Sequence, residues 1–307
     1  MFKKEDLFLH EYFEEWVQLF KKDAVRDVTL RKYYITYQHL RDIVPGLKLK
    51  DLNRRNYQKL INEYAKTHER QTTMDFHHQL KAAILDSIDE GIISINPTRN
   101  ITIKGKEPRP KKTKFLNQFE LQKLLKELEL GMEINWDWFI LLIAKTGLRF
   151  SEALGLTPKD FDFHNQQIDI NKTWNYKDPK GGFLPTKNIS SNRKVKIDWQ
   201  LAMQFSQLIS DIDENETVFV KKRVFNSTIN NRLERLCKKV DIPIITIHSL
   251  RHTHASLLLF AGVSIASVAK RLGHASMSTT QETYLHIITE LENQDNDKIM
   301  RHLSLLI

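Results

Sequence analysis

The chain has 307 residues, a formal net charge of +9 and a hydrophobic fraction of 41%. This hydrophobic content is enough to build folded cores, so the charge favours a polyanionic partner such as nucleic acid and does not indicate disorder. Cys237 is the single cysteine, which excludes a disulfide framework and a cysteine-type zinc site and is typical of a reducing compartment. The apolar runs fall well short of the ~20 residues of a membrane span, and the amino terminus has no apolar signal core. We therefore expect a cytoplasmic protein without membrane association.

The first hundred residues predict a small helical bundle. Apolar residues recur at helical spacing over about 5–22, 27–43, 53–66 and 72–90. Asp27 or Thr29 is expected to cap the second helix, and Gly91 is expected to end the fourth. Residues 1–98 are therefore predicted to form one helical domain.

Residues 99–114 are predicted to be an extended basic linker. Pro108 and Pro110 remove backbone donors and stiffen the path, which excludes a helix. The segment is either an ordinary solvated connection or a strap that follows DNA phosphates between two lobes, and the motifs further along the chain favour the strap. Its candidate DNA-binding residues are Lys104, Lys106, Arg109, Lys111, Lys112 and Lys114.

Residues 115–286 are predicted to form a second, mainly helical domain with a small antiparallel sheet at one edge. Residues 166–174 alternate like a strand, and 183–187 and 193–198 flank a polar turn. Ser278 and Gln281 are expected to cap the last helix of the domain. Residues 287–307 are predicted to be a tail helix, because their apolar end exceeds what a solvated terminus normally carries. The helices of the domain are expected at about 117–130, 135–146, 150–155, 199–210, 226–240, 249–261, 264–272 and 278–286.

Several cationic and polar residues recur in short motifs of this second domain. Arg149 begins a predicted helix in TGLRFSEALGL, and HSLRHTHAS places His248 and Arg251 on one face of a helical turn. His274 follows a glycine-marked turn in LGHAS, and Tyr284 lies ten residues later in TTQETYLHI. Lys187 stands in PTKNISSNRKVKI, where Lys194 and Lys196 are neighbouring alternatives to it.

These motifs resemble the active site of the tyrosine recombinases, the phage-integrase family. TGLRFSEAL is similar to the first arginine box of that family, and HSLRHTHAS, LGHAS and the tyrosine of TTQETYLHI are similar to the second box. The resemblance covers nearly the whole chain, with 1–98 similar to a SAM-like core-binding domain and 115–286 similar to the catalytic domain. It implies a mainly α fold with a small antiparallel sheet, arranged as a two-domain C-shaped clamp.

The resemblance also implies the chemistry. A tyrosine hydroxyl attacks a DNA phosphate, forms a 3′-phosphotyrosine and releases a 5′-hydroxyl, so no ATP, metal or other cofactor is expected. Two arginines suit the oxygens on which charge builds, because each guanidinium presents a rigid fork of donors. The implied catalytic residues are Arg149, Lys187 as general acid, His248 as an acid/base near the tyrosine, Arg251, His274 as a donor to the phosphate, and Tyr284 as nucleophile.

Partners are implied in the same way. We expect core-type sites in double-stranded DNA, a homotetramer on DNA that is a monomer or weak oligomer when free, and a directionality factor or host bending protein. The tail helix is expected to dock on a neighbouring catalytic domain. The motifs resemble integrases of Gram-positive phages and mobile elements more than Xer proteins. This favours integration and excision over dimer resolution. We expect the protein to be bacterial or phage-encoded and to be associated with the nucleoid. The chain begins almost directly at the core-binding lobe, so an arm-binding domain is expected to be absent or to lie outside this sequence.

Three other interpretations fit parts of the pattern. Residues 263–284 are typical of a helix–turn–helix repressor, which would not need Arg149 or Lys187. His248, His252, His254 and His274 suggest a metal hydrolase, although an arginine is electrostatically unfavourable inside a cation site. A type IB topoisomerase uses groups similar to those of a recombinase. His252 and His254 are interpreted as structural residues.

Overall fold

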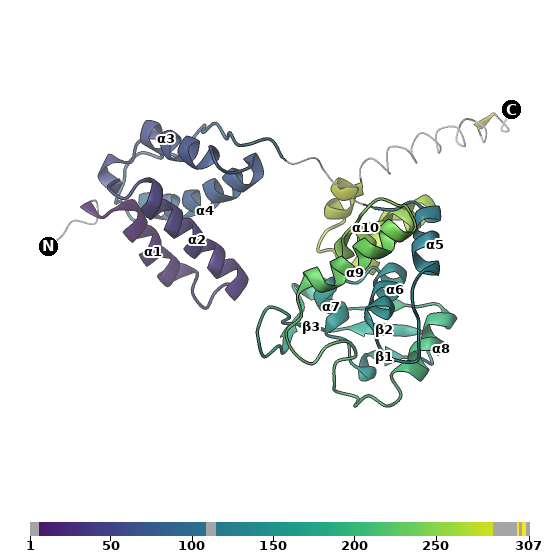
Figure 1. Ribbon diagram of the computed structural model, residues 1–307. Helices are drawn as coiled ribbons and strands as arrows, with labels where there is room; N and C mark the ends of the chain where they lie inside the picture. The colour runs from purple at the N-terminus through teal and green to yellow at the C-terminus, as the bar shows by residue number, and fades with distance from the viewer. Residues whose placement is uncertain (1–5, 109–114, 285–299, 301–302, 305–307) are drawn as a thin grey trace. The chain divides into compact units, whose positions relative to one another are not determined.

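The computed structural model describes residues 6–108, 115–284, 300 and 303–304, and the chain divides into two compact units, Met1–Lys111 and Lys112–Ile307 (Figure 1). Each unit has its own hydrophobic core. Within the described ranges no helix is long and apolar enough to cross a membrane. Arg109, Lys111, Lys112 and Lys114 of the predicted linker, and nearly all of the predicted tail helix, lie outside the described residues.

The first unit is the predicted four-helix bundle. Its core is lined by the apolar faces of α1 and α3 together with Leu40, Leu80 and Ile84. Arg26, not Asp27 or Thr29, is the N-cap of α2, and its side chain makes no capping bond. Asp27 instead occupies the first helical position, where a carboxylate favours the positive end of the helix dipole. Gly91 ends the fourth helix with φ +72° as predicted. The elements are α1 (Leu9–Phe20), α2 (Asp27–Ile43), a 3₁₀ turn η2 (Leu49–Asp51), α3 (Arg54–Ala65) and α4 (Arg70–Asp89).

The first half of the basic linker packs on this bundle. Gln58 of α3 bonds both backbone groups of Thr102 at 2.9 Å, and the Lys106 N–H donates to the carbonyl of His68 at 2.8 Å. A Cβ on Gly105 would lie 2.3 Å from the backbone nitrogen of Arg70, so only glycine permits this close approach. The segment is extended, as predicted, but it is fixed to the turn between α3 and α4 at least as far as Lys106.

The second unit surrounds its core with helices and carries the strands at one edge (Figure 1). The central helix α6 is buried on nearly all sides, which explains its almost continuous apolar sequence WFILLIA. Residues 277–284 form a further helical segment, and Ser276, not Ser278, provides its cap by accepting from the Thr279 N–H at 3.4 Å. The other helices and helical turns of this unit are α5 (Gln118–Lys126), α6 (Trp136–Thr146), α7 (Phe150–Leu154), η3 (Pro158–Asp160), η4 (Ile189–Ser191), α8 (Trp199–Leu208), α9 (Asn226–Lys239), α10 (Ile247–Phe260) and α11 (Ile265–Leu272).

The strands form two small antiparallel sheets and not one. β1 (Phe161–Asp162), β2 (Gln167–Ile170) and β5 (Arg193–Lys196) make the first sheet, and β3 (Lys172–Trp174) pairs with β4 (Phe183–Pro185) in the second. The predicted continuous strand 166–174 is therefore interrupted at Asn171, and the segments on either side of the polar turn pair with different partners. Beside this break the missing Cβ of Gly155 lets the end of α7 approach the backbone of Thr173, where a Cβ would lie at 2.9 Å.

Candidate active site

Arg149 stands between two helix ends. Gly147 ends α6 with φ +70°, and Arg149 is the N-cap residue of α7 two positions later. Its guanidinium donates to Glu152 Oε1 at 2.6 Å, to Ser191 Oγ at 3.3 Å and to the carbonyl of Gly273 at 2.8 Å. These bonds use three of the five N–H donors of an arginine and leave the others for a ligand.

Arg251 is held in the same way from the other side. Its side chain extends from α10, is 3% exposed, and donates to the carbonyls of Gly147 and Leu272, both at 2.7 Å. Those carbonyls belong to the C-terminal ends of α6 and α11, where helical carbonyls lack intrahelical partners and carry partial negative charge. Arg149 and Arg251 are therefore brought together by backbone groups of the same two turns.

A buried carboxylate links this pair to a third arginine. Glu152 is 1% exposed and accepts from Arg149 and, at 3.0 Å, from Arg193 of β5. Burial acts to raise the pKa of Glu152, but the neighbouring Arg193 and Arg149 outweigh it and hold that pKa below its usual value. Glu152 is therefore ionised and fixes Arg149 in place.

A fourth arginine, Arg271, ties three elements together. It donates to His254 Nε2 at 2.8 Å and to the carbonyls of Lys196 and Lys145 at 2.9 and 3.1 Å. The other ring nitrogen of His254 donates to the carbonyl of Ala144 at 3.0 Å. Both ring nitrogens are bonded to protein atoms, so His254 is the structural residue that the sequence predicted. Neither nitrogen is available to bind a metal ion.

Positive charge exceeds negative charge at this site. Within the described residues, the only carboxylate bonded to the guanidiniums of Arg149, Arg193, Arg251 and Arg271 is Glu152. Burial and the nearby charge of Arg149 lower the pKa of Arg251 to about 9. A buried cation that is destabilised in this way gains from an anion placed beside it. The arrangement is suited to bind a phosphate.

His274 and His248 border the cluster. Thr280 Oγ1 lies 2.7 Å from His274 Nδ1, and among the described residues Nε2 of that ring has no protein partner. Burial, with Arg251 and Arg149, lowers the pKa of His274 to about 4, so the ring is neutral at pH 7. His248 is solvent-exposed at the start of α10, and partial desolvation with the same arginines also lowers its pKa. The residues just before α10, 242–246, form a loop.

Tyr284 is buried at the end of the helical segment 277–284. It is 2% exposed and packs in a small cluster with Ala255, Leu259, Val268 and Leu272. Its hydroxyl lies 3.0 Å from Nδ1 of His252. Burial raises the pKa of Tyr284 to about 12, against the opposing effect of Arg251. The sequence did not predict this contact for His252.

Lys187 lies in the connection that follows β4, and its side chain is exposed. It makes no hydrogen bond or ion pair with the residues that the structure describes. The alternative Lys196 donates to the carbonyl of Asn165 at 2.7 Å, and Lys194 is exposed on β5. The structure thus brings together Arg149, Arg251, His274 and Tyr284, with His248 next to His252, and leaves Lys187 on a loop without a protein partner.

This chain is similar to known proteins both in sequence and in fold. Residues 114–290 match the model described as the phage integrase family. The chain belongs to the phage integrase family. This recombinase is 25% identical over 333 residues to the integrase of Staphylococcus phage L54a, an alignment that covers 95% of this chain and 92% of the phage protein.

Solved structures agree with this assignment at the level of the fold. The Tn1549 transposon integrase in complex with a circular intermediate DNA has a TM-score of 0.75 to this chain at 18% identity, covering 94% of this chain and 99% of that one. A lambda integrase tetramer bound to a Holliday junction has a TM-score of 0.62 at 18% identity, with coverage of 89% and 79%. The protein is a tyrosine site-specific recombinase that acts on DNA.

We predict that Glu152→Gln lowers the free energy of unfolding by about 3 kcal/mol, because it leaves the buried Arg193 and the half-buried Arg149 without their counter-charge. Urea denaturation followed by circular dichroism measures the change. Glu234→Gln is the matched control, since the Glu234–Lys238 ion pair is exposed and should contribute less than about 1 kcal/mol. A Glu152→Gln protein as stable as the wild type would contradict the structural role of this carboxylate.

We predict that acid destabilises the free recombinase well before its carboxylates titrate. The pKa values of His254 and His274 are lowered from 6.5 to about 4 in the folded chain. Between these values the unfolded chain binds more protons than the folded one, so stability is full above pH 6.5 and falls as the pH drops toward 4. Thermal melts from pH 7.5 to 5.0 should show a steadily falling Tm, and a constant Tm over that range would contradict the prediction.

Proposed function

We propose that the recombinase cleaves DNA through Tyr284, which attacks a phosphodiester to give a 3′-phosphotyrosine and a free 5′-hydroxyl. The observation that carries this proposal is the buried excess of positive charge around Arg149 and Arg251, next to a tyrosine. The phosphate gains charge on its non-bridging oxygens as it becomes pentacoordinate, and preorganised guanidinium donors favour that state over the ground state. The intermediate keeps the bond energy, so rejoining needs no ATP.

The other residues receive roles from their positions. His274, neutral at pH 7 and with Nε2 available, donates to a phosphate oxygen. His248 assists as an acid/base at the accessible side of the site. Lys187, exposed and without a protein partner among the described residues, is the general acid for the leaving 5′-oxygen. Each of these roles uses an atom that the fold leaves available.

A basic groove continues from the active site across the second unit and offers a path for the DNA backbone. It measures about 830 Å³ and lies between β5, α11 and residues 274–277. Its cationic lining residues are Arg193, Lys194, Lys196, Lys270 and Arg271, with no carboxylate among the lining residues. Phosphates next to the scissile one would replace counterions here.

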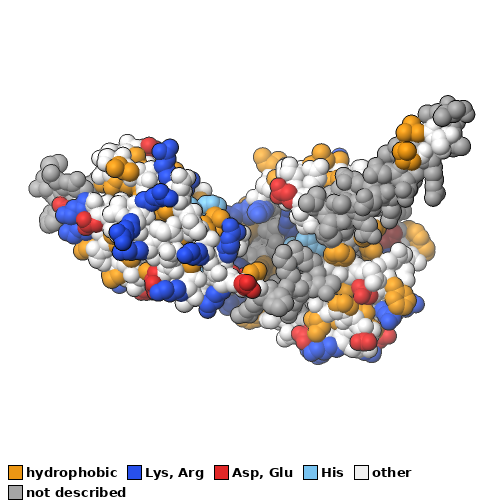
Figure 2. Space-filling view, turned by 90° about the horizontal axis from the view of Figure 1, so that it is seen from above, with side chains coloured by type: hydrophobic (Ala, Val, Ile, Leu, Met, Phe, Trp, Pro, Cys, Tyr) orange, Lys and Arg blue, Asp and Glu red, His pale blue; other side chains and the backbone are white. Residues whose placement is uncertain are grey.

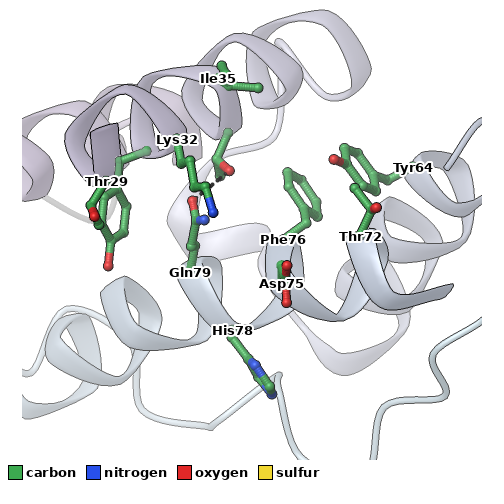
Figure 3. Close-up of a pocket in the computed structure, with 11 residues that line it drawn as sticks. Thr29, Lys32, Ile35, Tyr64, Thr72, Asp75, Phe76, His78 and Gln79 are labelled. Atoms are coloured by element: carbon green, nitrogen blue, oxygen red, sulfur yellow. Dashed lines mark hydrogen bonds between the residues drawn. The ribbon is translucent and has the colours of Figure 1, made fainter. Parts of the chain in front are cut away.

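The first unit offers a second surface for DNA. A groove of about 570 Å³ lies between α2 and α4, and Figure 3 shows Thr29 and Lys32 on one wall and Asp75 and Gln79 on the other. Such hydrogen-bonding side chains suit base edges and phosphates. Lys and Arg side chains are spread over the face of this unit that Figure 2 shows, and Lys104 and Lys106 of the docked linker are exposed as well.

In the cell we propose integration and excision of a phage or other mobile element at core-type sites. The similarity to the integrase of Staphylococcus phage L54a supports this role over dimer resolution. Two duplexes are each cut at two places, so a homotetramer on DNA is required, and the fold similarity to a lambda integrase tetramer on a Holliday junction is consistent with one. A directionality factor or host bending protein would set the direction, at the nucleoid in the cytoplasm.

We predict that Tyr284→Phe binds a suicide DNA substrate with unchanged affinity and forms no covalent adduct, because only the hydroxyl is lost. Arg149→Lys keeps the charge but loses the fork of donors, and it should slow adduct formation by ~10²-fold. Denaturing gel electrophoresis counts the adducts and gel shifts measure binding. An adduct formed by Tyr284→Phe would refute the proposed nucleophile.

We predict that Lys194→Ala combined with Lys270→Ala weakens binding to all DNA sequences alike. Two lost phosphate contacts should flatten the slope of log affinity against log salt concentration by up to ~1.8. Fluorescence anisotropy at several salt concentrations measures the slope. Lys159→Ala combined with Lys221→Ala, which removes the same charge outside the groove, is the control, and equal slopes for the two double variants would exclude the basic groove from the DNA path.

A further inference from the structure

One histidine outside the implied catalytic set contacts the nucleophile. His252 follows Arg251 on α10, and its Nδ1 lies 3.0 Å from the hydroxyl of Tyr284. The two rings are 5.8 Å apart and tilted by 58°, so the contact is made through the polar atoms and not by ring stacking. A neutral histidine protonated on Nε2 presents a lone pair at Nδ1, which matches a phenol that donates its proton.

The other histidines near the site make no contact with the hydroxyl of Tyr284 among the hydrogen bonds of the described residues. His248 lies one helical turn before His252, with its ring edge-on at 4.9 Å, and makes no hydrogen bond with any described residue. Thr280 occupies Nδ1 of His274, and both nitrogens of His254 are bonded to protein atoms. Among the described histidines, His252 is therefore the one whose ring nitrogen meets the attacking oxygen.

A phenol at this position needs a proton acceptor. Tyr284 is almost fully buried, which disfavours the phenolate, and a phenol is a weak nucleophile until it loses its proton. Arg251 acts in the opposite direction because its charge stabilises the phenolate. An imidazole nitrogen within hydrogen-bond distance of the hydroxyl is a group that can accept this proton.

We propose that His252 is a catalytic residue of this recombinase, the general base that takes the proton of Tyr284. As the Tyr284 oxygen bonds to phosphorus, the bond from phosphorus to the 5′-oxygen breaks. The phenolic proton passes to Nδ1 of His252, and the leaving 5′-oxygen takes a proton from Lys187. His252 ends as an imidazolium and Lys187 as a neutral amine, and rejoining of the strand returns both protons. The inference rests on the proposed role of Tyr284.

The first test compares His252→Gln with the wild type on a suicide substrate. We expect adduct formation to slow by ~10²-fold or more, with unchanged DNA affinity and an unchanged Tm. His164→Gln, the same substitution at an exposed loop histidine, should react like the wild type. A rate for His252→Gln within a few fold of the wild type would overturn the proposal.

The second test separates a base from a residue that only holds the tyrosine in place. A substrate whose 5′-bridging oxygen is replaced by sulfur has a leaving group that needs no proton, so it should rescue Lys187→Ala and leave His252→Gln slow. A 2,3-difluorotyrosine in place of Tyr284 has a more acidic phenol, and it should restore much of the rate of His252→Gln. Rescue of His252→Gln by the sulfur substrate, or no rescue by difluorotyrosine, would refute a general base.

These outcomes are distinct from failure of the proposed function. If the wild-type protein forms no adduct, or forms one through a residue other than Tyr284, the proposed nucleophile is wrong. If the wild type reacts through Tyr284 and His252→Gln reacts equally fast, the nucleophile stands and only the role of His252 is lost. Mapping the adduct by mass spectrometry in the wild type therefore precedes the comparison of variants.

Discussion

The repulsion between like charges that are held close together is the constraint on which this candidate active site depends. Arg149, Arg193 and Arg251 would repel one another in a low-dielectric interior, and one carboxylate, Glu152, offsets only part of that repulsion. Carbonyls at helix ends offset a further part of it, because they supply partial negative charge without adding a titratable group. The unliganded site therefore retains a deficit of negative charge that a phosphate can fill.

The need for carbonyl acceptors beside the arginines explains why Gly147 and Gly273 stand in these motifs. Gly147 has φ +70°, and a Cβ there would lie 2.7 Å from the ring of His254, while Gly273 has φ +68° and a Cβ would lie 2.9 Å from the Arg193 guanidinium. The carbonyls of these glycines are acceptors for Arg251 and Arg149 respectively. The same glycines thus end helices α6 and α11 and direct their carbonyls at Arg251 and Arg149, which is why TGLR and LGH occur as short contiguous motifs.

The difference between what the sequence predicted and what it missed has a physical cause. Helical periodicity located the helices, and the boxes located Arg149 and Arg251, because both signals are local. Glu152 and Arg193 are 41 positions apart, and nothing local distinguishes a buried arginine on a strand from a solvated one. The pairing of β4 with β3 was also missed, since the local sequence does not specify which strand is the partner. The contact of His252 with Tyr284 spans 32 positions and required the fold.

The location of Tyr284, the proposed nucleophile, relates its packing to the proposed chemistry. Tyr284 belongs to a small cluster of buried residues that is separate from the main core of its unit. Burial of an aromatic side chain contributes about 2–3 kcal/mol, so exposing this ring to a phosphate costs a limited amount and leaves the main core intact. The arginines, in contrast, are fixed by bonds to α6, α7, α11 and β5. The proposed phosphate site is therefore held by many bonds, whereas Tyr284 lies where a small rearrangement can bring its hydroxyl to a phosphate. In the proposed reaction the hydrogen bond to His252 stays with that hydroxyl until its proton is transferred.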